Sequence, residues 1–176
     1  MKLIPKHIDT LTHAVSTDET RYNLTGVYFD KTHKRAVATN GHMMAIKPLA
    51  VASDDMDSIP WGEVVKTPKK FEKGTKPFIH VNEAGINEQN PKDSVKFLGS
   101  SFPDYVQALP TKTPVMSVSF SADALLKLAK ALEAGDCLSK QIVTLEIISD
   151  SEPITVRPCY AKQKEAFGVL MPCKRG

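Results

Sequence analysis

The spacing of apolar and polar residues predicts a strand-rich opening to this chain. Residues 24–29 alternate in the manner of a β-strand, and residues 36–39 are typical of its hairpin partner across the polar turn 31–34. Asn40-Gly41 suits a backbone of positive φ. We therefore expect a chain reversal there that presents His42 and Met43 at a sheet margin, followed by a third strand over residues 44–46.

A short helix is predicted before this hairpin. Pro5 suits the first turn of a helix, and Ile8, Leu11 and Val15 recur at helical spacing. We expect about two or three helical turns, with residues 1–4 as a strand before them.

The middle of the chain predicts short, interrupted strands. Residues 63–66, 77–81 and 94–98 are strand-like, and no convincing helix is expected between them. Pro110 and Pro114 mark the main internal boundary.

The last third gives the clearest pattern. A strand over 115–120 leads to Ser121 as the cap of a helix that ends at Gly135, and strands follow over 142–148, 154–157 and 166–171. Both halves of the chain thus repeat a helix and three strands. The predicted class is α+β, with repeated strand-helix-three-strand units, antiparallel sheets and the helices on one face.

Composition adds only broad limits. The chain has 176 residues, 41% of them hydrophobic, and 23 Lys and Arg against 20 Asp and Glu, so one domain or two small ones and a mild net charge of +3 are expected. Cys137, Cys159 and Cys173 lack the spacing of a disulfide framework or a zinc site, which fits a reducing cytoplasm. The sequence shows neither a signal peptide nor an apolar run of about 20 residues, so we expect a cytoplasmic protein without membrane contact.

No catalytic signature stands out. The five histidines are scattered, and neither HExxH, GxGxxG nor GxxxxGK[ST] occurs, so we expect no catalytic residue, no metal and no cofactor. His42 beside Asn40 could serve in acid-base chemistry, but a histidine at a strand end is more often a packed or surface residue. A metal-dependent hydrolase remains the alternative enzyme hypothesis.

Several segments, taken in order, resemble one known family. Residues 16–30 and the run Ala38-Thr-Asn-Gly-His-Met-Met-Ala45 are similar to the middle domain of the bacterial DNA polymerase III β subunit, the sliding clamp, where the latter run is A-T-D-G-H-R-L-A. Residues 101–110 are similar to its R-F-P-D-Y-x-x-x-L-P joint, and residues 118–132 and 168–175 to the end of its last domain.

This resemblance implies a DNA-clamp-like fold for a shortened family member. Residues 1–110 correspond to a middle clamp domain and residues 111–176 to the second half of the last domain, either as two parts or packed as one continuous domain. The family's subunit carries three domains, so we expect no counterpart of its N-terminal domain. The resemblance also implies that the helix of the middle domain's second unit is reduced to residues 69–74.

The resemblance also implies a pocket for a linear peptide from a DNA polymerase or another replication protein. Met43 and Gln107 stand where the family has Arg, Asn40 where it has Asp, and Cys173 where it has Met, so a less basic pocket is expected. The methionines could instead fill a core. The implied pocket residues are Arg21, Leu24, Thr39, Gly41, His42, Met43, Met44, Pro103, Gln107, Ala108, Ser121, Val169, Leu170, Met171, Pro172 and Cys173.

Contact with double-stranded DNA is the second implied property. Lys6, Lys127 and Lys130, with Lys2 and His13 as further candidates, would face phosphates independently of sequence. The alternative is an ordinary solvated helix face. The leading hypothesis is a sliding-clamp-like processivity factor of DNA replication that assembles as a homo-oligomer. The second is a monomeric adaptor or decoy that keeps the peptide pocket but has lost ring closure.

Overall fold

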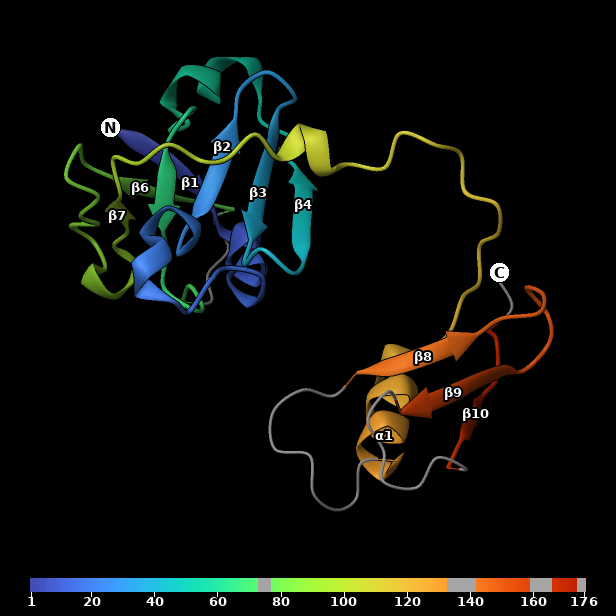
Figure 1. Cartoon of the computed structure of the whole chain (residues 1–176). Helices are drawn as coiled ribbons and strands as arrows, with labels where there is room; N and C mark the ends of the chain where they lie inside the picture. Colours follow the sequence, from blue (N-terminus) through green and yellow to red (C-terminus); the bar gives the residue numbers. More distant parts are fainter. Residues whose placement is uncertain (73–76, 133–141, 159–165, 174–176) are drawn as a thin grey trace. The chain divides into compact units, whose positions relative to one another are not determined.

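The chain folds into two compact units, Met1–Leu109 and Pro110–Gly176 (Figure 1). The computed structural model describes residues 1–72, 77–132, 142–158 and 166–173. Each unit has its own hydrophobic core and is described by itself.

The first unit combines two antiparallel sheets with short 3₁₀ helices. Its larger sheet has the order β4-β3-β2-β5-β7, and its smaller sheet pairs β1 with β6. Its strands are β1 (Lys2–Pro5), β2 (Val27–Asp30), β3 (Arg35–Thr39), β4 (Met44–Pro48), β5 (Val64–Lys66), β6 (Phe78–Val81) and β7 (Lys96–Phe97). Its helices are η1 (Lys6–His13), η2 (Glu19–Leu24), η3 (Ser53–Ser58), η4 (Pro91–Asp93) and η5 (Tyr105–Ala108).

One face of the larger sheet packs on the main core. Val27 and Phe29 of β2 are fully buried there, together with Ile8 and Leu11 of η1. The neighbouring strand β3 presents Ala36 to the same core, and a small side chain lets η1 approach β3 closely. The predicted N-terminal helix is therefore present and buries Ile8 and Leu11, although it is a 3₁₀ helix rather than an α-helix.

The opposite face of the same sheet is covered by the segment that ends the first unit. Tyr28, which alternates with Val27 and Phe29, stacks on Phe102 with ring centroids 4.9 Å apart and planes 4° from parallel. Tyr105 meets both rings edge-on and is buried. Residues 101–108 are therefore held on the sheet by aromatic packing.

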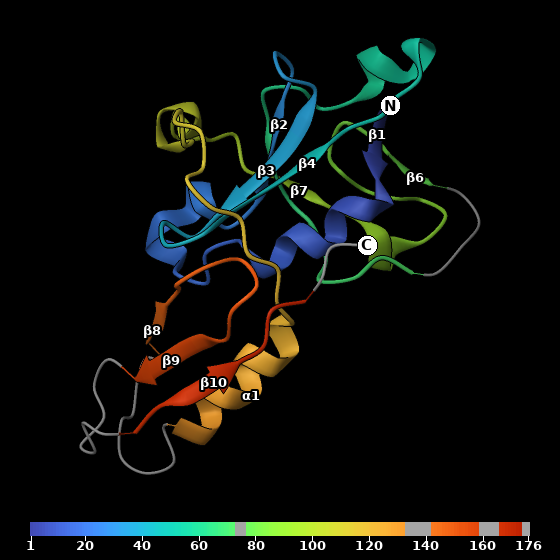
Figure 2. The same cartoon turned by 90° about the vertical axis from the view of Figure 1, so that its right-hand side faces the viewer.

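The second unit is one helix on a three-stranded antiparallel sheet. The sheet order is β10-β9-β8, from β8 (Val143–Glu146), β9 (Ile154–Pro158) and β10 (Gly168–Leu170), and α1 (Ala122–Leu132) covers one face (Figure 2). Ile154 and Val156 are buried beneath the helix. A Cβ at Gly168 would lie 2.5 Å from Cδ1 of Leu128, so the absent side chain lets helix and strand pack closely.

The α+β class and the antiparallel sheets are confirmed, and α1 begins directly after Ser121 as predicted. One predicted strand starts later than expected, and another was wrong. Residues 24–26 precede β2, because Asp18 accepts a hydrogen bond from the backbone N–H of Thr20 and begins helix η2 there. Residues 115–120 form no strand, since alternation alone supplies no partner for a ladder.

Some of the residues named from the sequence are not among those described. Residues 69–72 form no helix, and residues 73 and 74 lie outside the described ranges, as do Gly135, Cys137 and Cys159.

Candidate functional site

The turn between β3 and β4 is fixed by side-chain hydrogen bonds. Asn40 Oδ1 accepts from the backbone N–H groups of His42 and Met43 at 2.9 and 3.0 Å. Thr39 Oγ1 accepts from Gly41 N at 3.1 Å and donates to the carbonyl of Met43 at 2.7 Å. Gly41 has φ +88°, so glycine is the residue that takes this reversal without strain. Asn40 thus supplies the turn-forming oxygen.

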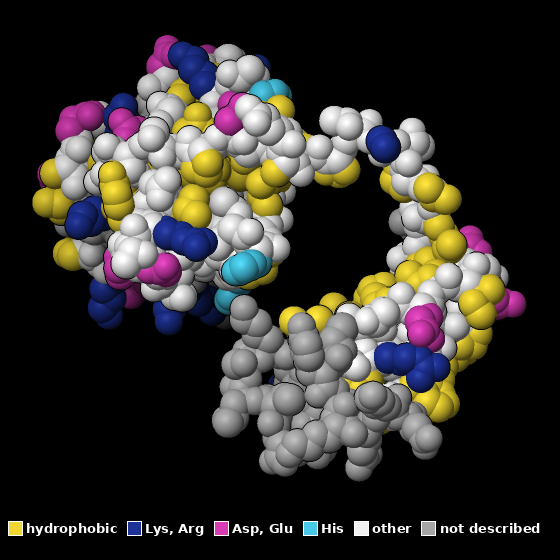
Figure 3. All heavy atoms as spheres, in the orientation of Figure 1, with side chains coloured by type: hydrophobic (Ala, Val, Ile, Leu, Met, Phe, Trp, Pro, Cys, Tyr) yellow, Lys and Arg dark blue, Asp and Glu magenta, His cyan; other side chains and the backbone are white. Residues whose placement is uncertain are grey.

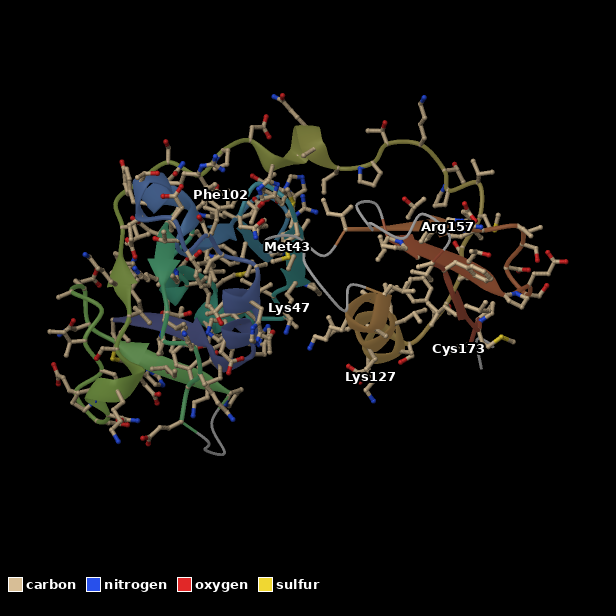
Figure 4. The ribbon with its side chains drawn as sticks, turned by 60° about the horizontal axis from the view of Figure 1, so that its bottom comes forward. Met43, Lys47, Phe102, Lys127, Arg157 and Cys173 are labelled. Atoms are coloured by element: carbon tan, nitrogen blue, oxygen red, sulfur yellow. The ribbon has the colours of Figure 1, made fainter. Side chains whose placement is uncertain are left out.

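This turn displays two candidate binding residues to solvent. His42 is exposed and Met43 is 51% exposed, while Met44, the first residue of β4, is half-buried. Met43 is marked in Figure 4. A half-exposed methionine on a fixed turn does not fill a core, so its side chain is available for an apolar contact.

Helix η2 places Arg21 beside the same turn. A Cβ at Gly41 would lie 3.2 Å from Nη1 of Arg21, and Arg21 Nε lies 3.8 Å from Asp18 Oδ2. Leu24, at the end of η2, is half-buried. The structure therefore brings Arg21, Thr39, Gly41 and Met43 together within the first unit.

Tyr22 is an exposed aromatic that the sequence reasoning missed. It lies on η2 between Arg21 and Leu24 and is 57% exposed. The sequence predicted a strand directly after Tyr22 and no helix at this position. Asp18, which caps η2 by accepting from Thr20 N, was the sequence signal for a helix.

A buried carboxylate fixes the segment that carries the joint residues. The Tyr105 hydroxyl donates to Asp30, and His33 Nδ1 lies 2.7 Å from Asp30 Oδ2. Arg35 Nε donates to the Tyr105 oxygen at 2.6 Å, with its guanidinium over the same ring. Phe102, labelled in Figure 4, adds the aromatic stack described above.

Burial and hydrogen bonds in this cluster shift two pKa values. Burial raises the pKa of Asp30, but the hydrogen bonds from Tyr105 and His33 together outweigh it, so the pKa lies below its ordinary value. Burial, and then the hydrogen bond to Asp30, raises the pKa of Tyr105 to about 12. Asp30 is therefore charged and Tyr105 neutral at physiological pH.

Helix η5 follows directly from this anchor. Asp104 caps it by accepting from Val106 N at 3.2 Å, and its second oxygen accepts from Gln107 Nε2 at 2.8 Å. Gln107 is thus exposed but already oriented by Asp104. Pro103 and Ala108, the other joint candidates, are exposed on either side.

The tail candidates divide into buried and exposed residues within the second unit. Leu170 is buried in the core, whereas Val169 and Met171 are 52% and 63% exposed. Exposed hydrophobic side chains gather on the visible face of this unit (Figure 3). Ser121 accepts from Ala124 N at 3.2 Å and caps α1.

An open pocket of about 520 Å³ lies beside this tail. Its lining comes entirely from the second unit, and Met171, Pro172 and Cys173 form part of it. Cys173 is exposed, and Figure 4 shows it beyond the end of β10. The remaining lining residues are Ser117, Ser119, Asp150 and Ser151.

The lysine candidates differ in their surroundings. Lys6 Nζ donates to the carbonyl of Glu72 at 3.0 Å, so its side chain also ties η1 to that segment. Lys127 and Lys130 are exposed on α1, and Figure 4 shows Lys127 projecting from the helix. Lys2 is half-buried in β1.

The described residues offer neither a metal site nor a membrane-spanning helix. No group of three or more His, Cys, Asp or Glu side chains in that part of the chain could hold a metal ion. None of the helices formed by those residues has the length and apolar character needed to cross a membrane.

Known proteins with similar sequences and folds are sliding clamps. Residues 1–104 match the family described as DNA polymerase III beta subunit, central domain. A beta sliding clamp from Rickettsia felis is 27% identical over 139 residues, which cover 70% of this chain and 37% of that protein.

Two solved structures share the fold at low sequence identity. The beta sliding clamp of C. crescentus has a TM-score of 0.60 and 17% identity, over 99% of this chain and 50% of that one. The DNA polymerase sliding clamp of Bacillus subtilis has a TM-score of 0.59 and 16% identity, over 97% and 48%. The chain thus spans about half the length of these clamps. Because the central-domain match covers more than half of its residues, the chain belongs to the DNA polymerase III beta subunit family.

Proposed function

We propose that this chain is a non-catalytic, clamp-like factor of DNA replication in the cytoplasm. It binds a linear peptide of a DNA polymerase or another replication protein. The observation that carries this proposal is the fixed turn that holds His42 and Met43 in solvent. A turn held by four side-chain hydrogen bonds loses little conformational freedom when a partner binds.

The exposed tail supports the same proposal. Met171 is 63% exposed and borders the pocket of the second unit. Exposed methionines are typical of surfaces that accept varied apolar side chains. Among the pocket candidates we assign Leu170 and Ser121 supporting roles, since one packs in the core and the other caps α1.

A peptide selection tests this function and requires no identified partner. A random heptapeptide display library is selected on the full chain, and the enriched peptides are titrated by fluorescence anisotropy. Met171→Asp on the second unit and His42→Ala on the first should each weaken binding at least tenfold, because each removes a side chain proposed to contact the peptide.

Leu126→Asp is the matched control. Leu126 is 50% exposed on α1 and lies outside the proposed site, so its replacement should leave peptide binding within twofold of the unsubstituted chain. If peptides bind equally well to Met171→Asp, His42→Ala and Leu126→Asp, the site is wrongly assigned.

Ring formation around double-stranded DNA is the second part of the proposal. The chain spans about half the length of the solved clamps, and we propose that several copies of it close the ring. Native mass spectrometry should detect a single closed homo-oligomer. A strict monomer with the same peptide affinity would replace this part by the second candidate, a peptide-binding adaptor without a ring.

A further inference from the structure

The pocket of the second unit is assembled from three separate segments. Ser117 and Ser119 precede α1, Asp150 and Ser151 form the turn between β8 and β9, and Met171 begins the tail after β10. Its volume of about 520 Å³ falls in the range that accommodates small ligands and side chains.

Hydrogen bonds hold two of these walls in place. Cys173 N donates to the carbonyl of Ser119 at 2.7 Å, which fixes the tail beside the stretch before α1. In the β8–β9 turn, Ser149 Oγ accepts from Ser151 N at 3.4 Å and from Glu152 N at 3.1 Å. The pocket is therefore formed by ordered backbone rather than by adaptable side chains alone.

The described part of the lining combines an apolar surface with one carboxylate. Met171 and Pro172 are apolar, the serines are neutral, and Asp150 is the carboxylate. Among the residues that the structure describes, no lysine or arginine lines the pocket, and Asp150 has neither a hydrogen bond nor an ion pair with any of them. A carboxylate beside an apolar surface complements a cationic head on an aliphatic stem.

We propose that the pocket beside Met171 binds a lysine or arginine side chain of the docking peptide, with Asp150 as the partner of its charge. This inference rests on the proposed peptide-binding function and specifies the peptide as apolar and cationic. Asp150 is exposed, so its contribution is to selectivity between peptides more than to total affinity.

The peptide selection described above tests this inference on the unsubstituted chain. Enriched heptapeptides should carry Lys or Arg at one fixed position beside apolar residues. Replacing that residue by norleucine should weaken binding about three- to fivefold at low salt, as expected for an exposed ion pair. The difference should shrink at roughly 0.5 M salt, where the charges are screened.

Variants of the pocket identify the charge responsible. Asp150→Asn should remove the preference for lysine over norleucine while binding the norleucine peptide as well as before, and Asp150→Lys should prefer a glutamate at that position. Asp123→Asn, which changes an exposed carboxylate of α1 outside the lining, should keep the lysine preference.

Two results would overturn the inference, and they are distinguishable. If peptides bind in a Met171-dependent manner without a cationic preference, or with a preference that Asp150→Asn leaves intact, the charge assignment is wrong and the proposed function stands. If no enriched peptide depends on Met171 or His42, the proposed function fails and the inference fails with it.

Discussion

Asp30 shows how one buried carboxylate can organise a segment far away in sequence. Only 6% of Asp30 is exposed, and its partners come from its own turn through His33 and from residue 105 through the tyrosine hydroxyl. A buried charge without partners would be costly, so this hydrogen-bonded set stabilises both the carboxylate and the chain that reaches it.

Tyr105→Phe should lower the free energy of unfolding of the first unit by about 1–2 kcal/mol, because it removes the hydroxyl between Asp30 and Arg35. Urea unfolding followed by the fluorescence of Trp61, the single tryptophan, reports on this unit. Tyr22→Phe is the control, since Tyr22 is 57% exposed, and its effect should stay below about 0.5 kcal/mol. Equal effects of the two changes would contradict the role given to Tyr105.

The lowered pKa of Asp30 also predicts how stability depends on pH. Between its folded and unfolded pKa values the unfolded chain binds a proton that the folded chain does not. The stabilisation is therefore present above the unfolded pKa, near 4, and is lost as pH falls through the lower folded value.

In Asp30→Asn, the free energy of unfolding should therefore fall less between about pH 5 and pH 3 than it does in the unsubstituted chain. Urea titrations at each pH measure this difference. Asp54→Asn is a suitable comparison, because Asp54 is exposed and has no partner among the described residues. An acid profile that is the same for Asp30→Asn and the unsubstituted chain would show that Asp30 is not the responsible group.

At the scale of elements, α1 depends on a stripe of leucines that contacts the sheet. Leu128 packs against Gly168 of β10, while Leu126, two positions before it, is 50% exposed. A leucine-to-alanine change alters helix propensity equally at both positions, but only at Leu128 does it remove packing on the sheet. Comparing the two therefore isolates the effect of packing.

Leu128→Ala should destabilise the second unit by about 2 kcal/mol, near the lower end for leucine truncation because the side chain is only partly buried. Amide hydrogen exchange of β9, which lies beneath the helix, should accelerate accordingly. Leu126→Ala should leave that exchange almost unchanged, and comparable acceleration in both variants would contradict the packing of Leu128 on the sheet.

The elements that the sequence predicted well are those with complete local signals. For α1 the periodic leucines and the Ser121 cap lie within the same dozen residues, and the helix begins where they indicate. Residues 115–120 alternate equally well, but Val115 is fully exposed and no ladder forms, since pairing requires a partner strand that alternation does not identify.

The candidate site was less predictable for the same reason. The turn at Asn40-Gly41 follows from two adjacent residues, so the exposure of His42 could be anticipated. Asp150 and Met171, by contrast, line the same pocket although about twenty residues separate them in the sequence. No local sequence pattern predicts that they lie close together. The family resemblance pointed to the tail but not to the acidic lining.

At the scale of the whole molecule, contact with DNA can be tested by replacing exposed lysines. Lys127 and Lys130 are exposed on α1, whereas Lys6 donates a hydrogen bond to Glu72. The two helix lysines are therefore the better candidates for phosphate contact, and they can be replaced without removing a described hydrogen bond.

Lys127→Ala with Lys130→Ala should weaken binding to a random-sequence duplex. The plot of log affinity against log salt should also lose roughly two units of slope, one for each phosphate contact removed. Lys31→Ala with Lys112→Ala removes the same charge from exposed positions elsewhere and should leave the slope nearly unchanged. An equal loss in both pairs would indicate a general effect of net charge.

The aromatic contacts of Phe102 and Tyr105 have a consequence for how the chain can be shortened. A version that stops at Leu98 would contain every strand of the first unit, yet it would leave Tyr28 without its stacking ring and Asp30 without the tyrosine hydroxyl. The smallest independent piece should therefore extend to Leu109, so that the last dozen residues of this unit act as its outer cover and not as a disposable link.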